Sequence, residues 1–271
     1  MTAHKKAHPA APAAPTSWDS LAAWYDGWVG AGGSHYHRTV AIPAVLDLLD
    51  PQPGEAILDI GAGQGVLAPA IAARGAHYTG VDASPRLIRL ARRRHGAQGR
   101  FLVGDARALA TTPGLGPGVF DGVVFLLSLQ DMDPLDPILA GAASMLRPGG
   151  HVVLLLVHPA FRVPRQSGWG WDAGRQLRYR RVDRYLTPLP VPMKPLPAGA
   201  GRTVTRSYHR PLHAYINGLA ACGLLVTRML EVPSPERSPA GAPVSAGERE
   251  IPLFLGLRTR KEDGAPPQNY P

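Results

Sequence analysis

One short stretch of the chain combines an acidic residue with closely spaced glycines. Asp59 ends an apolar run, and Gly61, Gly63 and Gly65 follow it at alternate positions. Glycine has no Cβ, so the backbone can turn tightly there and approach a ligand, with its amides directed at that ligand. A carboxylate beside the turn would repel a pyrophosphate but suits an ammonium or sulfonium group. The stretch therefore indicates a binding loop for a ligand with a positive centre.

The spacing of these glycines separates two classes of ligand. A dinucleotide-binding turn has the pattern Gly-x-Gly-x-x-Gly, and its third glycine falls where this chain has Val66. The position of Val66 and the charge of Asp59 both disfavour a nicotinamide-dependent oxidoreductase.

Two further acidic residues follow apolar runs. Asp82 closes the run 77–82, about twenty residues past the first loop glycine, where nucleotide-binding sheets place a carboxylate that accepts from ribose hydroxyls. Asp105 ends the run 100–104 in the same way. Ligands bind at the carboxyl ends of parallel strands, so we expect these two residues and Asp59 to share one sheet edge.

Together with Leu-Arg-Pro-Gly-Gly over residues 146–150, these motifs resemble those of the class I S-adenosylmethionine-dependent methyltransferases. The resemblance covers roughly residues 18–158 by motif, and the final helix and two strands by pattern. It implies S-adenosyl-L-methionine as cofactor and S-adenosyl-L-homocysteine as product, with Asp105 accepting from the adenine amino group. The cofactor-binding residues expected on this basis are Tyr25, Asp59, Gly61, Ala62, Gly63, Gly65, Asp82, Ala83, Asp105, Ala106, Leu126 and Ser128.

A further apolar run begins at Val119, and the segment that follows it indicates the class of methyl acceptor. It continues from Ser128 as Leu-Gln-Asp, without the Asn/Asp-Pro-Pro-aromatic motif common in enzymes that methylate base amines. The segment is similar to the small-molecule branch, including ubiquinone and menaquinone methyltransferases, where a histidine often occupies the place of Gln130. An amide cannot accept a proton at neutral pH, so this departure weighs against a general base at Gln130.

The elements that must position these residues are those of an α/β fold. We expect a Rossmann-like, doubly wound, mostly parallel seven-stranded sheet with an antiparallel edge strand. Residues 18–261 are interpreted as one domain, with a helical lid over 18–50 and a substrate-cap insertion over 159–209; residues 1–17 and 262–271 are interpreted as disordered tails. Tyr25-Asp26 resembles a lid pair of small-molecule methyltransferases, and simple packing of Tyr25 against the sheet is an equal alternative.

The predicted insertion interleaves aromatic residues with arginines. Such walls suit a flat ligand carrying a carboxylate or phosphate. They can equally stack and clamp single-stranded nucleic acid, and a third interpretation is that the insertion only packs on the sheet or forms a dimer. The predicted substrate-binding residues are Tyr36, Gln130, Phe161, Trp169, Trp171 and Tyr208.

Composition bounds the partners and the compartment. The net charge of +9 raises the question of nucleic acid, but five arginines between residues 86 and 94 fit the solvated face of one helix, which makes a nucleic-acid partner the second choice. The single cysteine, Cys222, excludes an internal disulfide and a cysteine-cluster zinc site and favours the cytoplasm. We expect no metal site and no membrane-spanning segment. We also expect the protein to be a monomer or a homodimer.

The sequence therefore predicts in-line methyl transfer to a small molecule, an aromatic or acidic metabolite. A sulfonium is already a strong electrophile, so the protein must chiefly align and desolvate the reactants. A base is needed only for a protonated oxygen or an acidic carbon; the candidates are His158, which leaves strand five toward the cofactor edge, then His37, His209 and Asp131. An RNA or protein methyltransferase using the insertion is the alternative, and a non-catalytic cofactor-binding regulatory protein is the third hypothesis.

Overall fold

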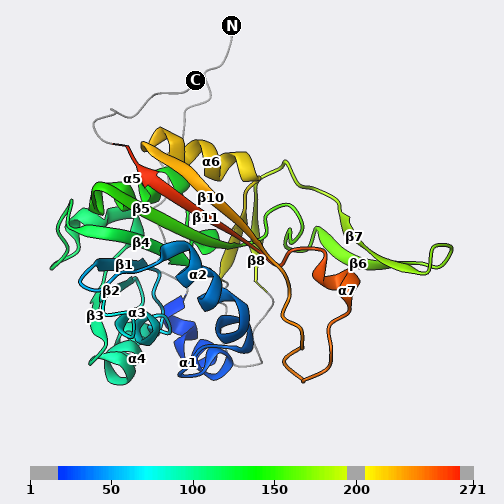
Figure 1. Ribbon diagram of the computed structural model, residues 1–271, viewed down its shortest axis with the longest axis horizontal. Helices are drawn as coiled ribbons and strands as arrows, with labels where there is room; N and C mark the ends of the chain where they lie inside the picture. Colours follow the sequence, from blue (N-terminus) through cyan, green and yellow to red (C-terminus); the bar gives the residue numbers. More distant parts are fainter. Residues whose placement is uncertain (1–17, 194–204, 263–271) are drawn as a thin grey trace, which may run out of the picture.

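A seven-stranded sheet forms the centre of the computed structural model, which describes residues 18–193 and 205–262 (Figure 1). Its strand order is β10-β11-β5-β4-β1-β2-β3. The strands are β1 (Ala56–Ile60), β2 (His77–Asp82), β3 (Gly99–Val103), β4 (Phe120–Leu126), β5 (Leu146–Val157), β10 (Leu224–Val232) and β11 (Phe254–Lys261). β1 to β5 are parallel, and β11 runs antiparallel to both of its neighbours. The mostly parallel sheet predicted from the sequence is confirmed, and the reversed strand lies second from the edge.

Helices cover both faces of the sheet (Figure 1). The helices are α1 (Trp18–Val29), α2 (Ile42–Leu49), α3 (Ala68–Ala72), α4 (Pro85–His95), α5 (Leu135–Met145), α6 (Leu212–Ala221) and α7 (Ala246–Arg249). α2, α3 and α4 pack on one face, and α5 and α6 pack on the other. Three short turns complete the set: the π-helical η1 (His37–Ala41) and the 3-10 turns η2 (Ala106–Thr111) and η3 (Leu129–Asp131). No helix in the described ranges has the length and apolar character to cross a bilayer.

The core lies in two layers because the central strands are apolar on both faces. Every residue of β4 is buried. Val123 and Phe125 point into the layer under α5 and α6, and Val124 and Leu126 point into the layer under α2, α3 and α4. This continuous apolar pattern is the one expected for a parallel strand covered by helices on both sides.

Residues 147–150 of the Leu-Arg-Pro-Gly-Gly motif belong to strand β5 in the structure. Leu146 pairs with Phe120, and the next registered pair is His151 with Gly122, so the intervening residues form an irregularity in the ladder. Arg147 forms an ion pair with Asp121 at this point.

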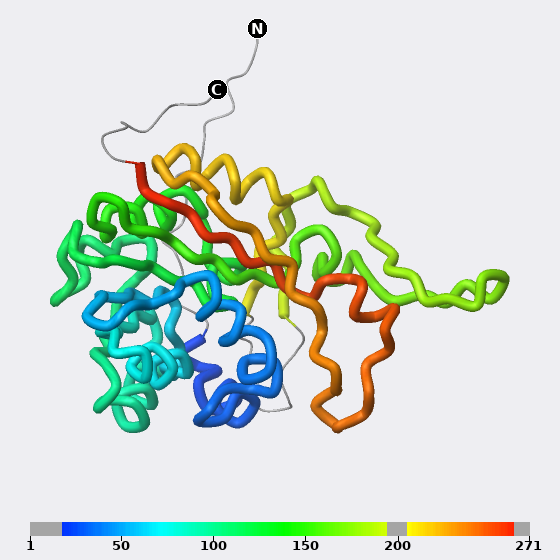
Figure 2. The backbone as a smooth tube through the Cα atoms, viewed as in Figure 1, coloured from blue at the N-terminus to red at the C-terminus, as the bar shows by residue number. Residues whose placement is uncertain are grey.

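The predicted insertion over residues 159–209 forms two hairpins. The first, β6 (Ser167–Asp172) and β7 (Leu177–Val182), projects away from the sheet (Figures 1 and 2). The second, β8 (Leu189–Pro192) and β9 (Arg206–His209), contacts η3 at the carboxyl end of β4. Residues 194–204, and the predicted tails at 1–17 and 263–271, lie outside the described residues.

Candidate functional site

The glycine loop between β1 and α3 needs glycine for both conformation and space. Gly61, Gly63 and Gly65 have φ values of 76°, 56° and 81°, in the left-handed region that side chains disfavour. A Cβ on Gly61 would lie 2.5 Å from the Cβ of Ser128. The loop can therefore pass directly beneath the residues that follow β4.

The amides of this loop are directed at the sheet, which corrects the expectation that they point at a ligand. Gly61 and Ala62 both donate to the carbonyl of Val81, at 2.8 and 3.0 Å, and Gly63 donates to Asp82 Oδ2 at 2.9 Å. These bonds tie the loop to the end of β2. The glycines thus leave room for Ser128, Tyr25 and Phe101 to pack directly against the loop.

Asp82 carries the clearest acceptor group at this edge. Its Oδ1 accepts from the amide of Ser84 at 2.8 Å, and its Oδ2 accepts from Gly63. Burial raises the pKa of this carboxyl, and the two backbone bonds act in the opposite direction. Each carboxylate oxygen can accept a second hydrogen bond, so Asp82 has the capacity for two ligand hydroxyls.

Asp59 is enclosed rather than open to a ligand. It is 2% exposed, and its Oδ2 accepts from the Tyr78 hydroxyl at 2.7 Å. Its Oδ1 has no hydrogen-bond partner among the described residues. Burial raises the pKa of Asp59 to about 7 despite the Tyr78 bond. The expectation of a free counter-charge beside the loop is therefore corrected: Asp59 braces β1 against β2.

Asp105 lies at the same edge, after β3, and holds the arginine that follows it. Arg107 Nε lies 3.0 Å from both carboxylate oxygens of Asp105, and its Nη2 lies 2.5 Å from Oδ2. These hydrogen bonds lower the pKa of Asp105. Its expected contact with an adenine amino group stays a prediction, and it would be made by an oxygen already shared with Arg107.

The remaining predicted cofactor residues stand around the same edge. Ala83 follows Asp82, Ala106 begins η2 and Leu126 ends β4. Ser128 donates to the carbonyl of Ile60 at 2.6 Å, which fixes the segment after β4 over the end of β1.

Tyr25 of α1 covers the glycine loop. A Cβ built on Gly63 would lie 3.6 Å from Tyr25 Cε1 and 3.7 Å from its hydroxyl oxygen, so the ring faces the loop across the space that a side chain would fill. Burial raises the pKa of Tyr25 well above its ordinary value, and the carboxylates of Asp82 and Asp131 add to the shift. The hydroxyl therefore lies near both acidic residues.

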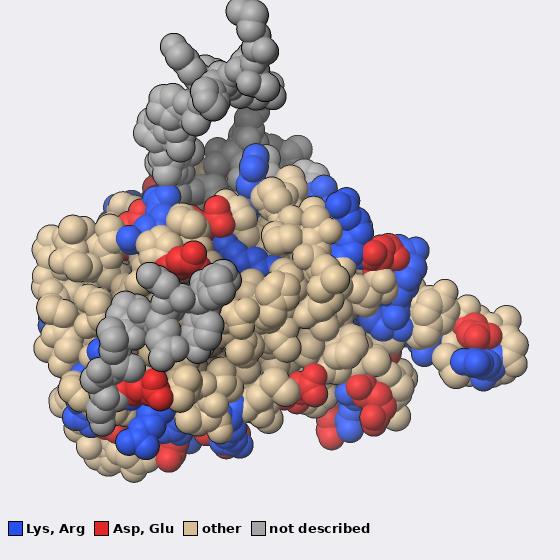
Figure 3. All heavy atoms as spheres, turned by 90° about the horizontal axis from the view of Figure 1, so that it is seen from above, with Lys and Arg blue, Asp and Glu red and all other residues tan. Residues whose placement is uncertain are grey.

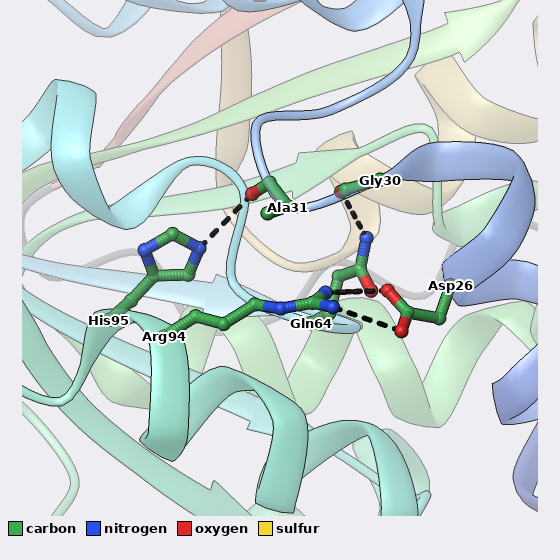
Figure 4. A network of polar contacts seen from close by, with 6 residues as sticks. All are labelled: Asp26, Gly30, Ala31, Gln64, Arg94 and His95. Carbon is green, nitrogen blue, oxygen red and sulfur yellow. Dashed lines mark hydrogen bonds and ion pairs between the residues drawn. The ribbon is translucent and has the colours of Figure 1, made fainter.

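A polar network holds α1 in this position (Figure 4). Asp26 and Arg94 of α4 form a two-point ion pair, with Oδ1–Nη1 at 2.5 Å and Oδ2–Nη2 at 2.9 Å. Arg94 also donates to Gln64 Oε1 at 3.0 Å, and Gln64 Nε2 donates to the carbonyl of Gly30 at 2.6 Å. Arg94 thus binds α1 and the glycine loop at once, which corrects its assignment to a solvated helix face.

The other end of α1 is tied to α4 as well. Asp19 Oδ1 accepts from the Ser84 hydroxyl at 2.7 Å and from the amide of Arg86 at 2.9 Å. These are free donors of the first turn of α4, so Asp19 acts as a second cap for that helix. α1 is therefore fixed beside the site at both ends.

Asp131 lies in η3, between the loop-covering tyrosine and the second hairpin. Burial raises its pKa to about 7, and a hydrogen bond with the Ser207 side chain of β9 opposes the shift. Its charge in turn raises the pKa of Tyr25. A carboxyl group with a pKa near neutrality, next to the cofactor-binding edge, can accept a proton under physiological conditions.

The candidate histidines are engaged elsewhere. His158 Nδ1 accepts from the amide of Ala160 at 3.2 Å, and its Nε2 lies 3.1 Å from Glu231 Oε1 on β10. β10 lies on the side of β5 opposite to β1, so this contact turns the ring away from the glycine loop and corrects the expectation that His158 faces the cofactor. Burial lowers the pKa of His158, with Glu231 opposing.

His37 and His209 are also fixed by hydrogen bonds. His37 Nδ1 lies 2.8 Å from Ser34 Oγ, and burial lowers its pKa to about 4. His209 Nε2 lies 2.6 Å from the carbonyl of Tyr185. Of the four candidate bases, Asp131 is the one whose position and pKa both suit proton transfer at the sheet edge.

A small hollow with a cavity volume of about 20 Å³ opens beside η3. Its lining residues come from η3, from the end of β5 and the start of the insertion, and from β9 and α6: Gln130, Val157, Pro159, Arg162, Pro164, Ser207, Tyr208, His209, Arg210 and Tyr215. Among the predicted substrate residues it brings together Gln130 and Tyr208.

The other predicted substrate residues lie outside that lining. Phe161 packs on the His158 ring at 4.7 Å, and Tyr36 packs edge-on against His35 at 5.7 Å. Trp169 is surrounded by three guanidinium groups at 5.4 to 5.5 Å. Trp171 is 57% exposed on the projecting hairpin. The structure does not bring these four aromatic residues to the hollow.

Residues not singled out from the sequence complete the hollow. Arg210 lies between β9 and α6, and Ser207 lies on β9 beside Asp131. The available signal for Arg210 was its place directly after Tyr208-His209, at the end of the insertion. Nothing in the sequence separates it from the many other arginines of that segment.

Comparison with known proteins adds a family assignment for part of the chain. Residues 57–150 match the family described as a methyltransferase domain. The chain is 32% identical over 145 residues to a ubiquinone biosynthesis O-methyltransferase of Xylella fastidiosa, covering 52% of this chain and 58% of that protein. A demethylmenaquinone methyltransferase of Tropheryma whipplei is 31% identical over 125 residues, 45% of this chain and 47% of that one. The chain thus spans about half the length of these curated relatives.

Solved structures share the fold over most of the chain. An S-adenosylmethionine-dependent methyltransferase from Mesorhizobium loti superposes with a TM-score of 0.65 at 25% identity, covering 81% of this chain and 96% of that one. A 1,6-didemethyltoxoflavin N1-methyltransferase from Burkholderia thailandensis, solved with 1,6-didemethyltoxoflavin and S-adenosylhomocysteine, has a TM-score of 0.54 at 19% identity and covers 94% of each chain.

Proposed function

We propose that this chain, which has the fold and the cofactor-binding half of a class I S-adenosylmethionine-dependent methyltransferase, transfers a methyl group to a small-molecule acceptor. The observation that carries the proposal is the arrangement at Gly63: its amide binds Asp82, and Tyr25 faces it from α1. Gly63, which has no side chain, thus lies between a ribose-type acceptor and an aromatic ring.

The residues at this edge fit the cofactor. Each oxygen of Asp82 keeps one acceptor position for a ribose hydroxyl. Asp105 lies at the same edge, and the resemblance implies that it accepts a hydrogen bond from the adenine amino group. When bound, S-adenosyl-L-methionine supplies a methyl group on a sulfonium, which needs alignment and exclusion of water rather than further activation.

The names of similar proteins support a small acceptor. The quinone-biosynthesis enzymes and the didemethyltoxoflavin enzyme among them are named for small-molecule substrates. The hollow adjoins η3, directly after the strand that bears Leu126, and is the place proposed for part of such an acceptor.

Asp131 is the proposed general base for an acceptor that loses a proton on methylation. Its carboxyl group lies between Tyr25 and Ser207, and its pKa of about 7 matches the range in which a base works best. His158 is a weaker candidate because both of its ring nitrogens already have partners, and His37 and His209 are weaker because one ring nitrogen of each has a partner in the protein.

Calorimetry with S-adenosylhomocysteine tests the proposal. The wild type should bind in the micromolar range, and Asp82→Ala should abolish binding because both acceptor oxygens are lost. The matched control is Asp47→Ala, which removes an exposed carboxylate of α2 that pairs with Arg228. This variant should bind as the wild type does. Wild-type affinity in Asp82→Ala would refute the site; failure of the wild type to bind the product would refute the function.

Transfer of labelled methyl groups into small-molecule and macromolecular fractions of a cell extract tests the reaction itself. Label in the small-molecule fraction supports the proposal. Label in RNA or protein supports the alternative, and no turnover of a protein that binds the cofactor supports the regulatory hypothesis.

One observation favours RNA as a second candidate. The projecting hairpin exposes Trp171 and Tyr179, at 57% and 46%, and basic side chains gather where it leaves the body (Figure 3). Most of its arginines have internal partners, however: Arg178 pairs with Glu248, and Arg180 donates to the carbonyl of Phe161 at 2.8 Å. RNA binding that weakens steeply with salt would favour this candidate; salt-independent or absent binding would remove it.

A further inference from the structure

Arg210 presents an unused donor inside the hollow. The residue is 7% exposed, and its Nη2 donates to the carbonyl of Met132 and to Asp133 Oδ1, each at 2.7 Å. Its Nη1 is buried and makes no hydrogen bond of normal geometry among the described residues, although the guanidinium lies near the Tyr215 hydroxyl and over the Tyr208 ring. A buried donor without a full hydrogen bond is destabilising, so a ligand acceptor at this place would be favoured.

Gln130 presents an unused acceptor in the same hollow. Its Nε2 donates to the carbonyl of Leu127 at 2.6 Å, which fixes the orientation of the amide. Its Oε1 is buried and, within the described part of the chain, unpaired. The hollow therefore contains one free donor on a cation and one free acceptor on a neutral group.

Two arginines line the hollow, and the carboxyl group of Asp131, which bonds Ser207 of the lining, opposes their charge when it is ionised. Arg162 also lines it, and its Nε and Nη2 bind the carbonyls of Pro252 and Ile251 at 3.1 and 3.0 Å, with no carboxylate in ion-pair range among residues 18–193 and 205–262. Arg210 has one carboxylate partner, Asp133, whose side chain is 50% exposed and thus screened by water. Two guanidinium groups in this setting favour an anion over a neutral or cationic ligand.

We propose that this hollow binds the methyl acceptor and selects a small carboxylate-bearing molecule, with the carboxylate on Arg210 Nη1 and the positive field of Arg162, and a hydroxyl or amino hydrogen on Gln130 Oε1. The proposal rests on the proposed function and adds the chemical class of its substrate. Val157, Pro159 and Pro164 supply apolar walls on which the body of a ring can pack.

The test uses two sets of probes that differ only in charge. Benzoate, salicylate, 4-hydroxybenzoate and 3,4-dihydroxybenzoate are titrated into the full-length protein saturated with S-adenosylhomocysteine, alongside their four primary amides. We expect the acids that carry a hydroxyl to bind at least tenfold more tightly than their amides, because the amide lacks the charge that Arg210 and Arg162 attract.

Variants then locate the selection. Arg210→Lys keeps a cation and a donor for Met132 but lacks the free Nη1, and we expect at least a tenfold loss of acid binding with unchanged S-adenosylhomocysteine binding. Arg210→Gln should abolish the preference for acids; a thermal melt shows whether it folds, and Arg210→Lys decides the question if it does not. The matched control is Arg181→Gln on the projecting hairpin, where the Arg181 side chain is 64% exposed. This variant should leave every affinity unchanged.

The outcomes separate the two proposals. Equal binding of acids and amides, no binding of any acid, or an acid preference that survives Arg210→Lys overturns the assignment of this hollow. Loss of S-adenosylhomocysteine binding in the wild type overturns the proposed function instead.

Discussion

Asp26 and Arg94 form a two-point ion pair that joins helix α1, part of the predicted lid, to helix α4 and, through Gln64, to the glycine loop (Figure 4). Asp26 belongs to the Tyr-Asp pair that the sequence assigned to a lid over the cofactor. In the structure the two residues make different contacts: Asp26 binds Arg94 of α4, and Tyr25 faces Gly63. The cover of the site thus depends on a contact made outside it.

Breaking this pair should loosen the cover. Arg94→Met removes a salt bridge between side chains that are 27% and 25% exposed, and a contact of this kind contributes about 1 kcal/mol or less. We expect a several-fold weaker affinity for S-adenosylhomocysteine by calorimetry, since part of the binding energy must now hold α1 in place. Arg93→Met, at an exposed position of the same helix, is the control. Equal affinity of the two variants for S-adenosylhomocysteine would contradict the idea that this ion pair holds α1 in place for binding.

Gly61 should tolerate no side chain. Gly61→Ala combines a φ of 76° with a Cβ placed 2.5 Å from Ser128 Cβ, whereas Gly118→Ala has a similar φ of 70° and open space around the Cβ. The backbone conformation alone is unfavourable by about 1–2 kcal/mol for alanine. Chemical denaturation should show that order of loss for Gly118→Ala and a clearly larger loss for Gly61→Ala. Similar losses would mean that the segment after β4 moves freely.

The sequence predicts the features that depend on residues close together in the chain. The glycine spacing and the acidic ends of three apolar runs led to the parallel sheet and the methyltransferase resemblance, both of which are confirmed, and to S-adenosyl-L-methionine, which is the cofactor named for the similar Mesorhizobium loti protein. A short motif and its strand lie next to each other in the chain, so no long-range contact had to be guessed. The roles of the individual site residues stay predictions.

Features that depend on distant contacts were not predictable. Arg94 appeared to lie on a solvated face because its partner, Asp26, is 68 positions away. Asp59 appeared open because the sequence does not show that Tyr78 closes over it. Likewise, composition could not show that the hairpin bearing Trp171 projects while the hairpin bearing Tyr208 contacts η3.

His37 should make the protein acid-sensitive. Burial lowers its folded pKa to about 4 from 6.5, so between these values the unfolded chain binds a proton that the folded chain does not. Stability is therefore full above pH 6.5 and falls as the pH drops toward 4, by up to about 3 kcal/mol. His37→Gln should flatten this slope in unfolding measured against pH, while His77→Gln, at an exposed position of β2, should retain it. A slope unchanged in His37→Gln would show that the ring is not buried as described.

Asp131 should set the acid limb of the methyl-transfer rate. The carboxylate form is the one that accepts a proton, and burial raises its pKa to about 7, so kcat/KM should rise with pH through about 7 and level off above it. Asp131→Asn should lose this limb and about 10²-fold to 10⁴-fold in rate, with S-adenosylhomocysteine binding retained. Asp136→Asn, which alters an exposed carboxylate on α5, is the control.

The same shift has a signature in stability that is independent of turnover. The folded protein holds a proton on Asp131 between about pH 4 and 7 that the unfolded chain has lost, so the wild type should lose stability relative to Asp131→Asn as the pH rises across that window. Observing the stability slope without the rate limb would show that Asp131 is buried as described but takes no proton from the acceptor. In that case the reaction needs no base, as expected for an acceptor whose attacking atom does not have to lose a proton before it attacks the methyl group.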